Sequence, residues 1–263
     1  MSTTLRNTTI NPDALTPAAK LRLIDELHAT HTKMFDGVSK RAFADHVVNS
    51  PADRTRIQIF RAGDRLVGYL AVHTFARIIA GERWVVVRGE TGKLPAYRRR
   101  ANGNLLISEI LRACLRHPRA RKAFLGCFVH PSAYVALAHV APQIYPHWDE
   151  PTDPEIHAVM ARLADEFGLE PAEAGRQGVR NVGWITRETQ AERDSWARRD
   201  DPMTRLFMTQ NPSYAAGHGL LVLVPLHLRN LVGGVSLHVH RELCRRLRGV
   251  RSNAQAGARK LVV

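Results

Sequence analysis

The sequence predicts a mixed α/β (α+β) fold, with a mostly antiparallel central sheet flanked by helices and a helical C-terminal extension. Hydrophobic residues recur at helical spacing in residues 17–48 and then alternate as strands in residues 56–87. A helix over residues 104–117 joins the third strand to a further strand, and such a crossover pairs strands in parallel. A chain of 263 residues, 44% of them hydrophobic, is long enough to bury a sizeable core.

The N-terminal part of the chain is expected to be a tail followed by two helices. Residues 1–14 are polar and are expected to form a disordered or poorly ordered tail. Thr16-Pro17 is typical of a helix start, because threonine caps free N–H groups and proline fits the first turn. This helix is expected to end at about Phe35, and a short second helix fits residues 39–48.

A three-stranded meander and a second group of elements complete the expected core, residues 15–150. The meander strands cover residues 56–60, 65–75 and 84–87, with Gly63 and Gly81 in the turns. The helix over residues 104–117, a buried strand over residues 123–129 and a helix from Pro131 follow.

Residues 151–263 are expected to form an α-rich extension that packs on or beside this core. Amphipathic helices are expected after Pro154 and over residues 188–199, with a strand near residues 182–185. The apolar segment 219–232 falls short of the roughly 20 residues that a membrane-spanning helix needs, and is a candidate lining for a long acyl chain. Residues 231–247 carry a leucine and valine stripe beside arginines.

The net charge of +14 is concentrated in two blocks. Residues 83–122 contain 11 basic and 2 acidic residues, and residues 241–263 contain 7 basic and 1 acidic residue. Such blocks favour an acidic partner, namely a phosphate group, an anionic membrane surface, nucleic acid or an acidic protein. The absence of aromatic residues in 241–263 argues against base stacking on nucleic acid. A codon bias toward arginine explains the composition but not the clustering.

The cysteine content and the N-terminus predict a cytoplasmic protein, with peripheral membrane association as an alternative. Cys114, Cys127 and Cys244 are few and far apart, so a disulfide framework is not expected. The N-terminus has no apolar stretch of the kind found in signal peptides. No metal ion is expected, because His28 and His31 share a helix face but lack an evident third ligand.

The most informative segment is a basic loop between a predicted strand and a predicted helix. Residues 93–104 read Lys-Leu-Pro-Ala-Tyr-Arg-Arg-Arg-Ala-Asn-Gly-Asn. Small residues let an anion approach the main chain, and N–H groups at a helix start attract negative charge. The loop is therefore predicted to bind a phosphate or pyrophosphate; the alternative is a basic surface loop before an ordinary helix.

This loop resembles the acyl-CoA loop of the GNAT (Gcn5-related N-acetyltransferase) superfamily, which reads Arg/Gln-x-x-Gly-x-Gly/Ala. Arg98, Ala101 and Gly103 match Arg-x-x-small-x-Gly, and Pro95 and Tyr97 precede the motif as in that family. The order of elements over residues 15–148 is also similar. Ala101 departs from the family's usual glycine, and its methyl group is expected to crowd a pyrophosphate.

The resemblance implies a donor site for acyl-CoA or acetyl-CoA, or for the phosphopantetheine of an acyl carrier protein. The residues expected to hold the donor are Lys93, Leu94, Arg98, Arg99, Arg100, Ala101, Asn102, Gly103 and Asn104. Carrier proteins are acidic, so the basic block that contains the loop favours one as a partner.

Glu90 is the expected base, because acyl transfer to an amine needs a group that removes the proton of the nucleophile. It lies just before the loop, where several members of the resembled family have a glutamate. Burial near Trp84 is expected to raise its pKa. The alternative is a surface carboxylate paired with Arg88 or Arg98.

Tyr134 is the candidate acid for the leaving thiolate, with His130 and His73 as substitutes. The position of the family's usual tyrosine falls on Leu137 here, which implies that the usual acid is absent or displaced. Packing against the sheet is the alternative role for Tyr134.

The sequence therefore predicts an acyltransferase that moves an acyl group from a phosphopantetheine thioester to an amine acceptor. The alternative is a non-catalytic GNAT-like module that binds anionic lipid or nucleic acid through the basic C-terminal segment. The departure at Ala101 and the displaced tyrosine motivate this alternative.

Overall fold

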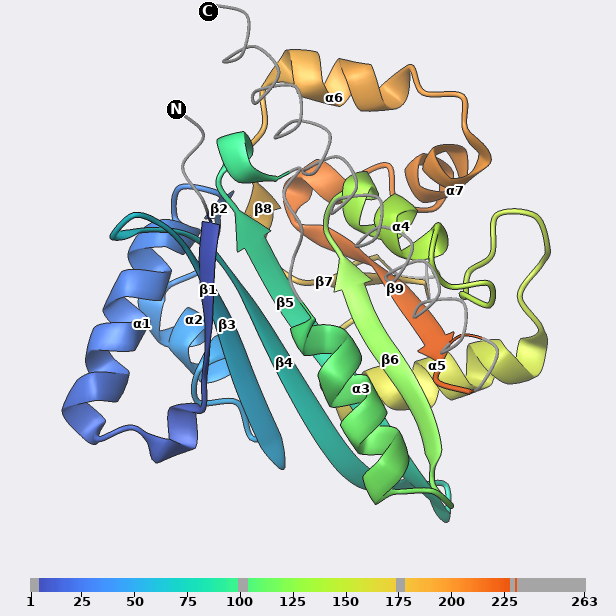
Figure 1. Cartoon of the computed structure of the whole chain (residues 1–263). Coiled ribbons are helices and arrows are strands. Elements are labelled where there is room, and N and C mark those ends of the chain that lie inside the picture. The colour runs from blue at the N-terminus through green and yellow to red at the C-terminus, as the bar shows by residue number, and fades with distance from the viewer. Residues whose placement is uncertain (1–4, 99–103, 174–177, 228–229, 231–263) are drawn as a thin grey trace, which may run out of the picture.

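The computed structural model describes residues 5–98, 104–173, 178–227 and 230, and its main sheet has seven strands (Figure 1). In spatial order these are β1 (Leu5–Ile10), β3 (Arg54–Ala62), β4 (Arg65–Ile79), β5 (Glu82–Lys93), β6 (Arg121–Phe128), β9 (His218–Pro225) and β7 (Val179–Asn181). A separate pair consists of β2 (Phe35–Asp36) and β8 (Ile185–Thr186). All neighbours are antiparallel except β5 and β6. The predicted mixed, mostly antiparallel sheet is therefore confirmed.

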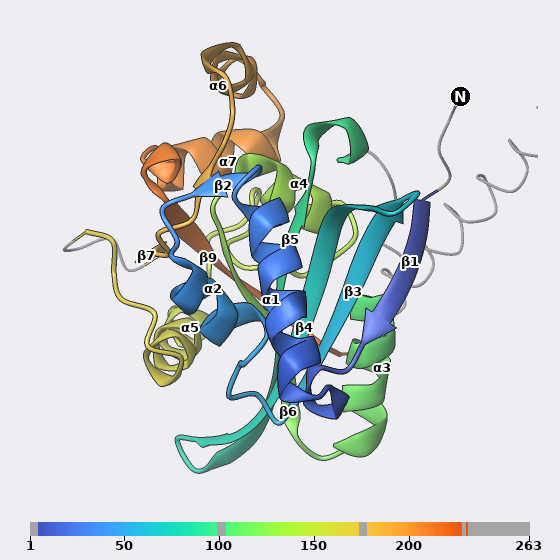
Figure 2. The same ribbon diagram turned by 90° about the vertical axis from the view of Figure 1, so that its left-hand side faces the viewer.

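Helices cover both faces of the sheet, as Figure 2 shows. The α-helices are α1 (Pro17–His31), α2 (Lys40–Val47), α3 (Leu105–Arg116), α4 (Pro131–Ala138), α5 (Pro154–Glu166), α6 (Gln190–Ala197) and α7 (Pro202–Gln210). The short 3-10 helices are η1 (Pro12–Ala14), η2 (Pro95–Tyr97) and η3 (Tyr214–Ala216). Helices α1, α2 and α5 lie on one face and α3 lies on the other, while α4 packs against α7.

The helices begin where the sequence places capping residues. The Thr16 side chain accepts a hydrogen bond from the N–H of Ala19 at the start of α1, and Ser39 does the same for α2. At α6, Thr189 and Glu192 form a reciprocal capping box. These bonds satisfy N–H groups that would otherwise lack a partner inside the helix.

The expected N-terminal tail is instead largely ordered structure. Residues 5–10 form β1, which pairs antiparallel with β3 along its whole length, and η1 follows. The six residues of β1 are half-buried at the ends and exposed between them. Backbone pairing with an edge strand therefore explains their order, and the side chains give no alternating apolar pattern from which to predict it.

The C-terminal part of the chain completes the sheet rather than packing beside a finished core. Residues 219–225 of the segment 219–232, the candidate acyl-chain lining, belong to β9, and residues 219–224 are buried between β6 and β7. A continuous apolar run suits a strand that is covered on both faces. The expected strand near residues 182–185 is replaced by the short β7 and β8 on either side of Trp184.

Some predictions fall outside the described residues. These include the stripe over residues 231–247, the second basic block and Cys244. In the part of the chain that the structure describes, no helix combines the length and the apolar character that crossing a bilayer requires.

Candidate functional site

Strands β5 and β6 pair over only four residues and then diverge (Figure 1). Residues 84–87 of β5 pair with residues 121–124 of β6, although both strands continue further. Residues 84–87 are buried, residues 88–90 are half-buried and Thr91 is exposed; on the other side, residues 127–130 are also half-buried. We call residues 88–91 and 127–130 the β5–β6 fork. No described strand pairs with β5 at the fork on the side facing β6, so backbone groups there are open to a ligand.

Glu90 lies in the fork and contacts two histidines from other elements. Its Oε1 is 3.1 Å from Nε2 of His46 on α2, and its Oε2 is 2.9 Å from Nε2 of His73 on β4. The Nδ1 atom of His73 is 2.9 Å from the hydroxyl of Thr55 on β3. A row of polar groups therefore runs from β3 to α2 across the sheet, with the carboxylate in the middle.

The pKa of Glu90 is held well below its usual range. Burial alone raises it, but the charges of His73 and His46 and their hydrogen bonds lower it further than burial raises it. The direction is opposite to the rise expected from the sequence. The reason is that Glu90 meets two imidazole rings, and neither Arg88 nor Arg98 is its partner.

His46 is the accessible member of this group. Its side chain is 43% exposed, compared with 11% for Glu90 and 2% for His73. Because its Nε2 faces the carboxylate, Nδ1 is the ring nitrogen without a partner in the described part of the chain. A histidine held by a buried carboxylate on one nitrogen can take a proton on the other, which is the usual arrangement of a general base.

The described donor-loop residues lie at the open end of β5. Lys93 is buried, its pKa is lowered to about 8 by burial, and its ammonium group lies 4.3 Å from the centre of the Phe60 ring. The N–H of Leu94 donates to Val67 O at 2.9 Å. Asn104 precedes α3 and makes no side-chain capping bond. Arg99, Arg100, Ala101, Asn102 and Gly103 lie outside the described residues.

Tyr134 occupies the core on α4. Its side chain is fully buried, and its hydroxyl donates to Pro146 O at 2.8 Å. Burial raises its pKa. The structure thus gives Tyr134 the packing role that was the alternative at this position, and its hydroxyl proton is engaged.

A second histidine–carboxylate pair lies at the β6 side of the fork. His130 Nε2 is 3.1 Å from Oε2 of Glu188, whose side chain is 1% exposed. Nδ1 of His130 accepts the N–H of Ser132 at the start of α4. On the β5 side, Arg98 donates to the carbonyl of Arg187. Residues 187–188 therefore connect the two sides of the fork at its open end.

Sequence reasoning missed His46, Glu188 and Trp184 as parts of this region. Trp184 is buried, with its ring 5.9 Å from that of His46 and 4.6 Å from that of His31. None of the three lies in a recognisable motif. His46 has a weak signal, because it lies between Phe43 and Val47, two apolar residues that this short helix buries.

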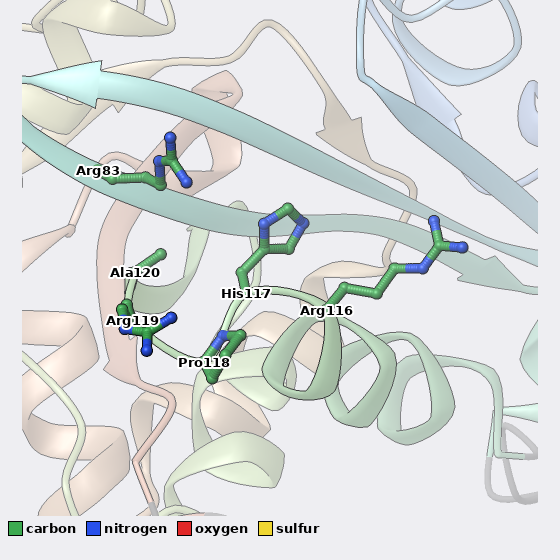
Figure 3. Close-up of a pocket in the computed structure, with 6 residues that line it drawn as sticks. All are labelled: Arg83, Arg116, His117, Pro118, Arg119 and Ala120. Atoms are coloured by element: carbon green, nitrogen blue, oxygen red, sulfur yellow. The ribbon is translucent and has the colours of Figure 1, made fainter.

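Two surface hollows lie at the other end of β5. One, of about 200 Å³, is lined by Arg83 and by residues 116–120 between α3 and β6 (Figure 3). The second, of about 250 Å³, includes Arg54 and Glu109. Arg83 and Glu90 are seven residues apart on one strand, which is roughly 23 Å. The basic block over residues 83–122 is thus split between two ends of the molecule, and most of it lies away from the donor loop.

In the described residues, no group of three or more His, Cys, Asp or Glu side chains is placed to hold a metal ion. This includes the group of His46, Glu90 and His73. The described cysteines Cys114 and Cys127 are free.

No protein-family model and no curated protein matches the chain. Similar solved structures include an Enterococcus faecalis V583 protein described as a probable N-acyltransferase, with 13% identity and a TM-score of 0.36, covering 53% of this chain and 33% of that chain. They also include Arabidopsis thaliana NAA60 with acetyl-CoA, with 18% identity and a TM-score of 0.35, covering 51% and 83%. A Streptococcus pneumoniae acetyltransferase of the GNAT family has 10% identity and a TM-score of 0.35, covering 84% and 99%. This chain thus spans a third of the length of the Enterococcus protein. Over residues 15–148 the structure has two helices, a three-stranded meander, α3, β6 and α4, which is the order that the resemblance to the GNAT superfamily predicts.

Proposed function

We propose that the protein is an N-acyltransferase that moves an acyl group from a phosphopantetheine thioester to an amine. The observation that carries this proposal is the buried Glu90 carboxylate, held between His46 and His73 where β5 loses its partner strand. The histidine–carboxylate group supplies a proton acceptor for the amine. The strand edge beside it supplies backbone groups that can bind the arm of the thioester.

The open edge of β5 suits the pantetheine arm of the donor. Pantetheine is extended and carries amide groups, and an unpaired strand edge offers N–H and C=O groups to such a chain. The donor phosphates are assigned to the loop over residues 93–104, where the sequence motif lies.

In the reaction, the amine attacks the thioester carbonyl and gives up a proton as the tetrahedral intermediate forms. His46 takes this proton on Nδ1, while Glu90 accepts the hydrogen bond of Nε2 and stabilises the charged ring. The low pKa of Glu90 keeps the carboxylate ionised for this role. The C–S bond then breaks, the thiolate leaves and the amide remains.

The experiment measures thiol release with acetyl-CoA, a longer acyl-CoA and an acyl carrier protein thioester, each with a panel of primary amines. Glu90→Gln is expected to lower kcat/KM by about 100-fold or more, because it removes the carboxylate that holds His46. Glu82→Gln is the matched control, since Glu82 lies on the same strand and pairs with Arg121 on the surface. Equal rates for Glu90→Gln and the wild type, or no thioester consumption with any donor, would contradict the proposal.

The choice between the two donors is tested by calorimetry. Arg98 lies at the donor end of β5, whereas Arg83, Arg116 and Arg119 line the hollow at the other end. Because arginines lie at both ends of β5, this side of the molecule would attract an acidic carrier protein. Tighter binding of acyl carrier protein than of acetyl-CoA, with a strong salt dependence, is the result expected for a carrier-protein donor.

A further inference from the structure

Two arginines on the face covered by α5 lack an ionic partner. Arg88 lies on β5 two residues before Glu90, and Arg180 lies on β7 with 3% of its surface exposed. The Nε atom of each is buried without a hydrogen-bond partner. Arg88 lies over the Phe167 ring at 4.9 Å, and Arg180 donates to Leu169 O at 3.1 Å. In the described ranges, neither guanidinium forms an ion pair with a carboxylate.

Both guanidinium groups lie near Cys127, on the β6 side of the fork. Burial raises the pKa of Cys127 to about 11; the charges of Arg88 and Arg180 oppose this rise, and the charge of Glu90 adds to it. All three charges therefore act on the same thiol. Arg88 and Glu90 point to one face of the sheet, because they are two residues apart on β5 and the pairing of β5 with β4 is regular there.

Glu90 forms no ion pair with either arginine in the described ranges. Its two carboxylate oxygens contact His46 and His73 instead. A charged group that is removed from water without a partner is costly, and the cost falls when an anion binds. A guanidinium offers two parallel N–H donors that fit a carboxylate.

We propose that Arg88, supported by Arg180, binds a carboxylate group of the acceptor, so that the amines acylated here are amino acids or other amines that carry a carboxylate. The inference rests on the proposed acyl transfer, because it assigns the acceptor of that reaction. Arg88 and Glu90 are two residues apart on β5, which is roughly 6.7 Å along the strand. Since Glu90 contacts His46, we expect one small molecule to place its carboxylate at Arg88 and its amine near His46.

The test compares each free amino acid with its own primary amide as the acceptor, for glycine, leucine and phenylalanine, at equal concentrations of unprotonated amine. The wild type is expected to prefer the free acids by about tenfold to a hundredfold in kcat/KM, the worth of a charge-assisted hydrogen bond. Arg88→Met is expected to abolish this preference, and Arg88→Lys to retain part of it. Arg65→Met is the matched control, because Arg65 is an exposed arginine of the neighbouring strand β4 and has no part in the proposed site.

Two results would overturn the inference. One is equal turnover of acids and amides by the wild type, or a preference that Arg88→Met leaves unchanged. The other is a loss of acetyl-CoA affinity of about tenfold or more in Arg88→Met, which would assign the arginine to the donor phosphates.

Direct titration of the amino acids separates this inference from the proposed function. Calorimetric binding of leucine, but not of leucinamide, that disappears in Arg88→Met supports the carboxylate site even if no thioester is consumed. Turnover of amides and acids at equal rates supports acyl transfer and contradicts the carboxylate site. Thermal unfolding of Arg88→Met and Arg65→Met shows whether each variant is folded before either result is interpreted.

Discussion

Glu90 and Glu188 are both buried carboxylates with an oxygen 3.1 Å from a histidine Nε2 atom, that of His46 and that of His130, yet these two histidines differ at their second nitrogen. Nδ1 of His130 accepts the N–H of Ser132, so both nitrogens of that ring are engaged. Nδ1 of His46 has no partner in the residues that the structure describes, and the ring is more exposed. The same chemical pair can therefore transfer protons at one side of the fork and only hold structure at the other.

The surroundings of the two carboxylates agree with this division. Glu188 is approached by Arg193 at 3.5 Å and lies in the short segment that joins β8 to α6. Glu90 is approached by a second imidazole, and a histidine can release its proton whereas an arginine cannot. Both carboxylates are buried, so burial does not distinguish the structural pair from the catalytic one. The second group that contacts each carboxylate does.

The largest expected effect comes from the two histidines. His46→Gln is expected to lower kcat/KM for thioester aminolysis by about 100-fold, because it removes the proton acceptor. His130→Asn, which keeps a capping acceptor for the N–H of Ser132, is expected to leave the rate within about twofold. Steady-state thiol release measures both. A larger loss in His130→Asn than in His46→Gln would reverse the assignment of the two pairs.

The next effect concerns stability rather than rate. Glu188→Ala leaves His130 without its carboxylate, and is expected to cost about 3 kcal/mol of unfolding free energy. Asp200→Ala, at an exposed acid just after α6, is the control and is expected to cost about 0.3 kcal/mol. Urea unfolding measures the difference. Equal stability of the two variants would remove the structural role of Glu188.

His31 tests what a histidine does without any carboxylate. It is buried among aromatic rings, its Nδ1 is 2.9 Å from the Tyr69 hydroxyl, and burial, then His28, lowers its pKa to about 4. The unfolded chain takes up the proton near pH 6.5 and the folded chain only near pH 4, so the unfolded state binds more protons between these values. Stability is therefore expected to fall as pH falls through this window, by about 3 kcal/mol.

Unfolding measured at several pH values checks this expectation. His31→Phe is expected to flatten the stability profile between pH 4 and 6.5, while His157→Gln, at an exposed position, is expected to leave the slope unchanged. A slope that persists in His31→Phe would mean that another group titrates in this window.

The helices α1–α4 and the strands β3–β6 were predictable because each carries a local signal. Thr16 and Ser39 cap helices, and the meander strands are apolar runs separated by short turns. The first helix ends at His31 rather than at about Phe35, and β2 (Phe35–Asp36) was not predicted. β1 and β9 were not predictable in the same way. β1 is ordered by backbone pairing, and the apolar run of β9 is compatible with a strand or a helix until its neighbours are known.

The site was predictable at Glu90 but not at its partners. Glu90 follows from its place before a motif on the same strand, whereas His46 lies 44 residues away and reaches it only when α2 packs on the sheet. The basic block over residues 83–122 is continuous in the sequence but divided in the fold, for a related reason. β5 and α3 run in opposite directions, so arginines that are close in the sequence lie at opposite ends of the fold (Figure 1).

The smallest expected effect belongs to an exposed pair at the open end of the fork. Arg98 and Glu192 are 3.7 Å apart, with 35% and 47% of their side chains exposed. Water and salt screen such a pair, so Arg98→Gln is expected to change the unfolding free energy by less than about 0.5 kcal/mol, and the difference should vanish in about 1 M salt. Urea unfolding at low and high salt measures it. A loss comparable to that of Glu188→Ala would mean that residues 187–188 are held in place mainly from the β5 side. The comparison between the two buried pairs would then no longer explain how this end of the site is built.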